Sequence, residues 1–105
     1  VGDCETGVDT EVLRVIKKSV RKRVFNEEER EYCGDDIQKG VWLWTRLEAA
    51  LKLSGEGIGG IDKRSFSLLK DCEGLYIDTF EADGSVISVA CGEPFEAEII
   101  KFASE

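Results

Sequence analysis

Apolar and polar residues alternate along residues 41–53, and this alternation is compatible with two kinds of element. The stretch reads VWLWTRLEAALKL and contains both tryptophans of the chain. As a strand it would place Trp42 and Trp44 on one face, because strand side chains repeat every two residues. As a helix it would place Val41, Trp44 and Leu51 on one stripe. The length of the alternation favours a strand, whereas Leu, Ala, Glu and Lys in its second half favour a helix, so both remain open.

A helix is expected near the N-terminus. Asp9 is a suitable N-cap, and Val8 and Leu13 occupy the positions of a hydrophobic staple around it. Apolar residues then recur at i, i+4 spacing, at Val12, Ile16, Val20 and Val24. This pattern predicts a helix that begins after Asp9 and turns its apolar stripe toward the core.

A second, shorter helix is expected over residues 27–33, or as an extension of the first. Asn26 followed three positions later by Glu29 has the spacing of a capping sequence. Gly34 would end this helix, because glycine adopts the left-handed conformation common at helix C-termini.

The second half of the chain predicts an antiparallel sheet. Residues 75–81 and 86–91 are strand-like segments on either side of Asp83-Gly84, a dipeptide typical of a two-residue type I′ turn. In that register Phe80 would face Ile87 and Tyr76 would lie near Cys91. A last strand is expected over 97–103. The predicted fold is therefore one α+β domain, residues 1–105, with an N-terminal helix or helix pair packed on a curved antiparallel sheet of about four strands.

The charge of the chain is uneven. Its 14 basic and 22 acidic residues give a net charge of −8, which disfavours nucleic acid as a partner. Six cations nevertheless occur between Val12 and Phe25 with no acid among them. Those expected to face solvent, as candidates for docking an anionic surface, are Lys17, Lys18, Arg21 and Lys22. The alternative is a solvated helix face that pairs with the protein's own carboxylates.

Four cysteines in a short chain suggest a disulfide-stabilised fold. The pairing Cys4–Cys33 with Cys72–Cys91 would close two local units, and each bond would contribute roughly 3–4 kcal/mol. The alternative is four reduced, buried thiols. No zinc site is expected, because the chain has no histidine and no CxxC pair.

Little in the sequence indicates catalysis. The absence of histidine removes the usual general base and the usual catalytic triad. Gly55, Gly57 and Gly60 satisfy GxGxxG, but Glu56 would repel a pyrophosphate, and the chain is too short for a doubly wound sheet. No catalytic residue, cofactor or metal is predicted, and no apolar run reaches the roughly 18 residues of a membrane span.

The favoured interpretation is a secreted or periplasmic binding protein that is not an enzyme, such as an inhibitor, an immunity-type protein, a toxin subunit or an effector. The chain begins at Val1 and contains no Met, as expected after removal of a leader. Its partner would be another protein, bound through Trp42, Trp44 and the basic helix face. Two alternatives remain: an intracellular structural or regulatory protein of thermophilic or viral type, and a small enzyme that uses carboxylates or a free thiol.

Overall fold

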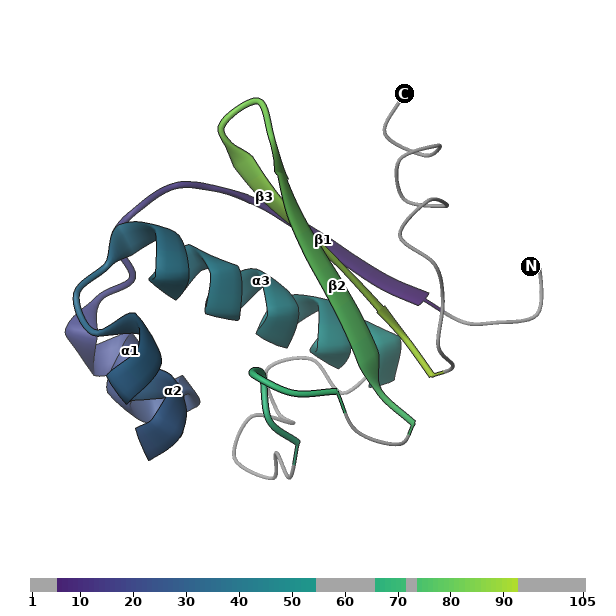
Figure 1. Cartoon of the computed structure of the whole chain (residues 1–105), viewed down its shortest axis with the longest axis horizontal. Helices are drawn as coiled ribbons and strands as arrows, with labels where there is room; N and C mark the ends of the chain where they lie inside the picture. Colours follow the sequence, from purple (N-terminus) through teal and green to yellow (C-terminus); the bar gives the residue numbers. More distant parts are fainter. Residues whose placement is uncertain (1–5, 55–65, 72–73, 93–105) are drawn as a thin grey trace.

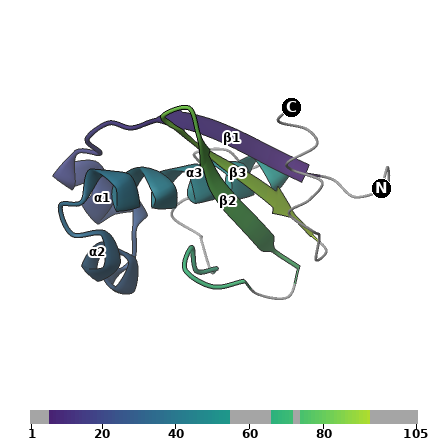
Figure 2. The same cartoon turned by 45° about the horizontal axis from the view of Figure 1, so that its top comes forward.

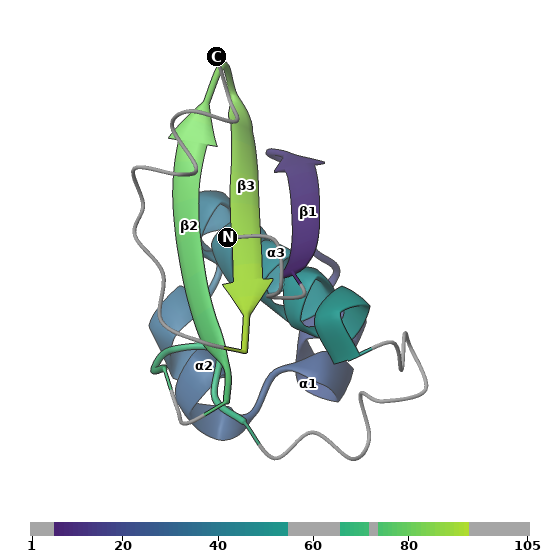
Figure 3. The same ribbon diagram turned by 90° about the vertical axis from the view of Figure 1, so that its right-hand side faces the viewer.

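The α+β class is confirmed by a computed structural model that describes residues 6–54, 66–71 and 74–92. These residues form a three-stranded antiparallel sheet in the order β1-β3-β2, with the long helix α3 packed across one face (Figures 1 and 3). The short helices α1 and α2 gather at the N-terminal end of α3 (Figure 1). The elements are β1 (Thr6–Val12), α1 (Lys18–Val24), α2 (Glu27–Cys33), α3 (Ile37–Ser54), β2 (Tyr76–Ala82) and β3 (Ser85–Cys91).

The predicted first helix is wrong over its N-terminal half, which forms strand β1. β1 pairs along its whole length with β3, from Thr6 opposite Cys91 to Val12 opposite Ser85. Its β-branched residues Val8, Thr10 and Val12 alternate with Gly7, Asp9 and Glu11, and branched side chains fit a pleated strand better than a helix. The i, i+4 pattern of valines was therefore compatible with both periods, and helix α1 begins only at Lys18.

The interpretation of residues 41–53 as a strand is also wrong, because this stretch lies inside helix α3. Asp36 caps the helix by accepting a hydrogen bond from the backbone N–H of Lys39 at 2.9 Å. α3 packs against the sheet on one side and against α2 at its N-terminal end, as Figures 1 and 2 show. A helix that packs against other elements on several sides has apolar residues on most of its faces. Its sequence therefore lacks the one-sided apolar stripe by which a helix is recognised.

Two local predictions are confirmed. The Asn26 side chain accepts from the N–H of Glu29 at 2.8 Å while the Glu29 carboxylate accepts from the N–H of Asn26 at 2.9 Å, a complete capping box, and α2 ends at Gly34. Asp83 and Gly84 have φ of 53° and 78° at the tip of the β2–β3 hairpin. Its register places Phe80 opposite Ile87 and Tyr76 opposite Cys91, as expected.

Buried polar side chains join the elements. The second carboxylate oxygen of Glu29 accepts from the N–H of Leu68 at 2.9 Å. The guanidinium of Arg46 donates to the carbonyl oxygen of Leu68 at 2.7 Å and to the hydroxyl of Thr79 at 2.9 Å. Segment 66–71 is thereby held between α2, α3 and β2.

A fourth strand is not found among the described residues, and of the predicted disulfide cysteines that are described, Cys91 is disulfide-bonded whereas Cys33 is not. Cys33 is a buried free thiol, so the predicted Cys4–Cys33 pair is wrong. Cys4, Cys72, the glycine-rich stretch around Gly57 and the strand predicted over 97–103 lie outside the described residues. Within the residues that are described, no helix is both long and apolar enough to cross a membrane.

Candidate functional site

The inner face of β1 presents polar residues to α3. Gly7, Asp9 and Glu11 alternate with the exposed Thr6, Val8 and Thr10, and Asp9 retains only 6% of its accessible surface. Gly7 brings β1 directly against the backbone of α3. A Cβ atom there would lie 2.1 Å from the carbonyl oxygen of Ala49 and 2.5 Å from the backbone nitrogen of Leu53. Only glycine therefore allows β1 to come this near to the helix.

Helix α3 contributes a carboxylate and an ammonium group to the same place. Glu48 and Lys52 are four residues apart, so they lie on one face of the helix. The Nζ atom of Lys52 lies 2.9 Å from Oδ1 of Asp9 and donates a second hydrogen bond to the carbonyl oxygen of Val8 at 3.1 Å. The pairing with Asp9 raises the pKa of Lys52. This ion pair connects the last turns of α3 to the middle of β1.

Burial and a neighbouring acid disfavour the charged form of the Asp9 carboxyl group. Burial raises its pKa to about 6, Lys52 opposes this rise, and the neighbouring carboxylate of Glu11 adds to it. Its Oδ2 atom is buried and has no hydrogen-bond partner among the described residues. A buried carboxylate oxygen without a partner is costly, so its presence marks a position prepared for a proton or another cation.

Glu11 and Glu48 complete what we call the acidic cluster, which consists of Asp9, Glu11 and Glu48. Burial raises the pKa of Glu48, Glu11 raises it further, and Lys52 and Arg14 oppose the rise. Arg14 also pairs with Glu11 at 3.0 Å. Three carboxylates are thus accompanied by two cations, and the charge of Glu11 contributes to the raised pKa of both Asp9 and Glu48.

The acidic cluster suits chemistry at a phosphate group. In the described part of the chain no three acidic, His or Cys residues form a complete metal-binding group. Mg²⁺ does not need one, because it is commonly held by one or two carboxylates together with substrate phosphates. The partnerless Oδ2 of Asp9 fits that role, as does the carboxylate of Glu48, whose charge interacts with Glu11 and Lys52, and Lys52 adds a positive charge beside Asp9.

None of the residues predicted as a binding site lies in the acidic cluster. Trp42 and Trp44 are half-buried on a helix, so they do not share a face as they would on a strand. Trp42 packs on the guanidinium of Arg46 at 4.3 Å, and Trp44 lies 5.9 Å from that of Arg14.

The four predicted basic residues lie around α1, away from the acidic cluster. Lys17 is the N-cap of α1, and Lys18 and Lys22 are exposed on the helix itself. Arg21 is turned inward, where it donates to the carbonyl oxygen of Gly34 and lies 3.4 Å from Asp35. A basic solvent-facing α1 surface is therefore present, with Arg21 partly withdrawn from it.

The residues of the acidic cluster lie in segments whose secondary structure was not assigned correctly from the sequence. Asp9 was interpreted as a helix cap, which would place Glu11 in the first turn of that helix. On a strand the same two acids share one face, and the β-branched residues occupy the other. Glu48 and Lys52 share a face only if residues 41–53 are helical. Recognising the site required both secondary structures to be assigned correctly.

Comparison with known proteins gave one match. The family model of the 4′-phosphopantetheinyl transferase superfamily (ACPS) matches residues 5–99, which include β1, α3 and every residue of the acidic cluster. No curated protein and no solved structure matches the chain.

Proposed function

Because the chain belongs to the 4′-phosphopantetheinyl transferase superfamily, we propose that it transfers a 4′-phosphopantetheinyl group and that the acidic cluster with Lys52 is its reaction centre. The observation that carries this assignment is Asp9. It combines a buried carboxylate oxygen that has no partner among the described residues with a pKa raised to about 6. Such perturbed acids concentrate at functional sites.

Membership in a transferase family corrects two predictions. The interpretation as a secreted binding protein without enzymatic activity is wrong, because the family is a family of enzymes. The expectation that the chain is not an enzyme falls with it. The extracellular or periplasmic location is a separate matter and stays a prediction.

The transfer of this group is a displacement at phosphorus. An acceptor oxygen attacks the phosphorus, a new P–O bond forms, and the bond to the leaving phosphate of the donor breaks. The attacking hydroxyl loses its proton, and the leaving group departs with an additional negative charge. Catalysis of such a reaction depends on positioning and on neutralising the charge of the phosphate oxygens.

We assign two of the three carboxylates to holding a divalent cation together with the donor phosphates. Asp9 offers its partnerless Oδ2, and Glu48 accepts no hydrogen bond from the described residues. When bound, the cation would polarise the phosphate and withdraw charge from its oxygens. The raised pKa of Asp9 keeps part of this carboxyl protonated below about pH 6, so cation binding is expected to strengthen as the pH rises through that value.

Lys52 supplies an ammonium group that is exposed enough to bind a phosphate as well as Asp9. Its side chain is 53% exposed although it is hydrogen-bonded to Asp9. An ammonium group at the edge of a site can donate to a phosphate oxygen while it keeps its hydrogen bond to Asp9. We assign Lys52 to phosphate binding and to stabilisation of the charge that develops during transfer.

The test uses coenzyme A as the donor, since it carries the 4′-phosphopantetheinyl group on a pyrophosphate. Titration calorimetry with and without Mg²⁺ measures donor binding, and mass spectrometry of acidic acceptor proteins measures the added group. Asp9→Asn and Glu48→Gln should remove the effect of Mg²⁺ on binding, and Lys52→Met should weaken binding about tenfold or more, since a hydrogen bond to a charged group contributes roughly 1.5–3 kcal/mol. Lys39→Met is the matched control, since Lys39 lies over the ring of Tyr32 at the other end of α3. Donor binding that is equal in all four variants would refute the assignment.

We further propose that the acceptor is an acidic protein that docks on the basic face of α1, formed by Lys17, Lys18 and Lys22. These side chains are exposed and have no ion pair among the described residues. An isolated cation contributes little to stability, so a run of them suits recognition of an anionic surface. The acidic remainder of the protein would favour a single orientation of the partner.

The docking proposal is tested with the triple variant Lys17→Gln, Lys18→Gln and Lys22→Gln. Its KM for the acceptor protein should rise, most strongly at low salt, while donor binding stays unchanged because the acidic cluster is intact. A triple variant with unchanged acceptor KM at low ionic strength would show that another surface binds the acceptor.

A further inference from the structure

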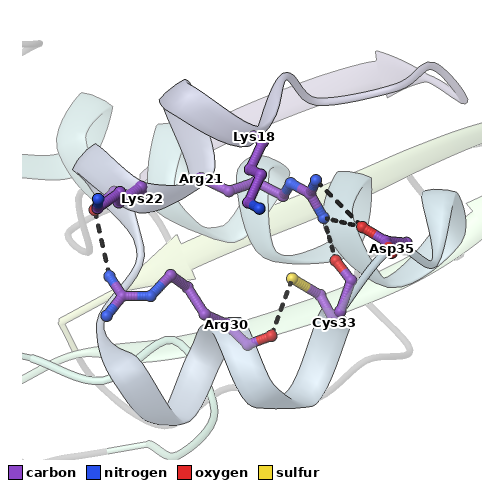
Figure 4. Close-up of a pocket in the computed structure, with 7 residues that line it drawn as sticks. Lys18, Arg21, Lys22, Arg30, Cys33 and Asp35 are labelled. Carbon is purple, nitrogen blue, oxygen red and sulfur yellow. Dashed lines mark hydrogen bonds and ion pairs between the residues drawn. The ribbon is translucent and has the colours of Figure 1, made fainter.

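A cavity of about 340 Å³ lies between α1 and α2. It has no role in the transfer reaction proposed above. It is lined by Lys18, Arg21, Lys22, Arg30, Cys33, Gly34 and Asp35. Figure 4 shows these side chains between the two helices, with the sulfur of Cys33 on the wall. Four of the seven residues are cations and one is an acid, so the lining residues carry a net positive charge, although the surface they present to the cavity is mainly aliphatic.

The two arginines are fixed by the protein itself. Arg21 donates to the carbonyl oxygen of Gly34 and lies 3.4 Å from Oδ1 of Asp35 (Figure 4). Arg30 donates to the carbonyl oxygens of Phe25 at 2.8 Å and Lys22 at 3.2 Å. Backbone carbonyls hold both guanidinium groups in place without neutralising their charge. Asp35 neutralises little, because its side chain is fully exposed.

Donors remain unused in the cavity. Among the described residues the ammonium groups of Lys18 and Lys22 have no hydrogen bond or ion pair. The Nε atom of Arg21 is buried and has no partner in the described part of the chain. A buried N–H without an acceptor is costly, and an anion in the cavity would supply one.

The cavity is remote from the acidic cluster. Gly34 and Asp35 directly precede α3, whereas Lys52 lies near its C-terminal end. Glu48, the member of the acidic cluster on α3, lies eleven positions after Ile37, which corresponds to roughly 16 Å along the helix axis. The two regions also have opposite charge. A ligand of the cavity is therefore separate from the group that the acidic cluster would bind.

We propose that this cavity is a second ligand site, which binds a small molecule carrying a phosphate monoester. Phosphate matches the unused donors, because ammonium and guanidinium groups pair with its oxygens through charge-assisted hydrogen bonds. The volume exceeds what a phosphate fills, and the aliphatic parts of Lys18, Lys22 and Arg30 provide a wall for an organic body. Because Lys18 and Lys22 also belong to the proposed docking face, a bound phosphate ester would reduce acceptor docking.

The binding test needs neither donor nor acceptor. Inorganic phosphate and glycerol 2-phosphate are titrated into the full chain at constant ionic strength, and amide chemical shifts are followed by NMR. Shifts should concentrate at Lys18, Lys22 and Gly34, and tighter binding of the ester would identify an organic phosphate rather than free phosphate as the ligand. The thiol of Cys33 gives a second readout, since a bound ligand should slow its alkylation.

Matched variants separate the site from general charge. Lys18→Gln with Lys22→Gln should weaken binding about tenfold or more, as loss of charge-assisted hydrogen bonds implies. Lys17→Gln with Arg23→Gln removes the same charge outside the cavity and should change the Kd less than about threefold, the scale of a screened surface charge. Asp9→Asn should bind phosphate as the parent does, which keeps this test independent of the transfer reaction. Equal losses in the two double variants, or no loss in either, would overturn the proposal.

Discussion

At the scale of single residues, Asp9 and Gly7 decide the geometry of the proposed reaction centre. Gly7 allows β1 to touch the backbone of α3, and two residues later Asp9 meets Lys52 at 2.9 Å. Asp9 bears the cost of this contact, because its carboxylate loses water and gains the neighbouring Glu11. Function and stability are therefore opposed at this position.

Asp9→Asn is expected to stabilise the fold at neutral pH. The folded pKa of about 6 lies above the unfolded value near 3.9, so the folded state binds more protons between these values and stability falls as the pH rises through them. Above pH 6 the penalty is complete, and Asn removes it. Urea unfolding should give a gain of about 1–3 kcal/mol at pH 8 and almost none below pH 4. A variant less stable than the parent at pH 8 would contradict the burial argument.

Gly7→Ala should separate β1 from α3. The added Cβ meets backbone atoms rather than a flexible side chain, so the strand must move, at a cost of about 1–3 kcal/mol. Donor binding should fall with stability, because Asp9 moves away from Lys52. Gly40→Ala is the control: its Cβ would lie 3.7 Å from the nearest atom, a side-chain carbon of Ile16, and alanine should stabilise the helix by up to about 1 kcal/mol. Denaturant unfolding of both variants measures the contrast.

At the scale of elements, α3 organises the fold through a buried charge. Arg46 reaches from α3 to the carbonyl oxygens of Leu68 and Ile77 and to the hydroxyl of Thr79, and it stacks on Trp42. Burial lowers its pKa, while Asp71 and Asp78 partly compensate. One side chain thus joins helix, sheet and the 66–71 segment.

Arg46→Met is expected to destabilise the protein by about 2–4 kcal/mol. Methionine fills much of the space but leaves the carbonyl oxygen of Leu68 without its donor, and unsatisfied buried groups account for the loss. Lys39→Met, which removes an exposed cation from the same helix, should change stability by less than about 1 kcal/mol. Thermal or urea unfolding compares the two, and similar losses would show that Arg46 has no special structural role.

The elements predicted correctly from the sequence are those whose signals are local. Asn26 and Glu29 cap a helix by contacting each other, and Asp83-Gly84 adopts positive φ whatever surrounds it. β1 and α3 depend on distant partners instead. Their residues are compatible with both the strand period and the helix period, and the conformation is decided only when β1 pairs with β3 and α3 packs on the sheet. The acidic cluster joins residues about forty positions apart, so it could not be found before both elements were placed.

At the scale of the whole molecule, the charges are divided between the two ends of α3. The acidic cluster lies toward its C-terminal end, and the basic cavity lies beside its N-terminal end. Between them, α3 is buried against the sheet, which keeps the two regions at a fixed separation. The two ligands proposed for these regions, a donor phosphate and an anionic partner, would therefore bind to separate surfaces.

Cys33 should be a reduced thiol in the purified protein. Its sulfur is 3.8 Å from the carbonyl oxygen of Arg30, and the residue is 2% exposed. Iodoacetamide should modify it slowly in the native state and completely in denaturant without reductant, as peptide mass mapping would show. Resistance of Cys33 to alkylation in denaturant, reversed by reductant, would instead indicate a disulfide.

The pairing of β1 with β3 has a consequence for how the protein is made. Every residue of β1 finds its strand partner between Ser85 and Cys91, at the other end of the described chain. Closing so long a loop is slow, and it requires the hairpin that presents β3. During synthesis, α2 and α3 can form while β1 still has no neighbouring strand. A nascent chain that ends before Ser85 thus contains Asp9, Glu48 and Lys52, but β1 has only α3 to pack against and no strand to pair with, so the proposed reaction centre would be held in its final geometry only once β3 is added.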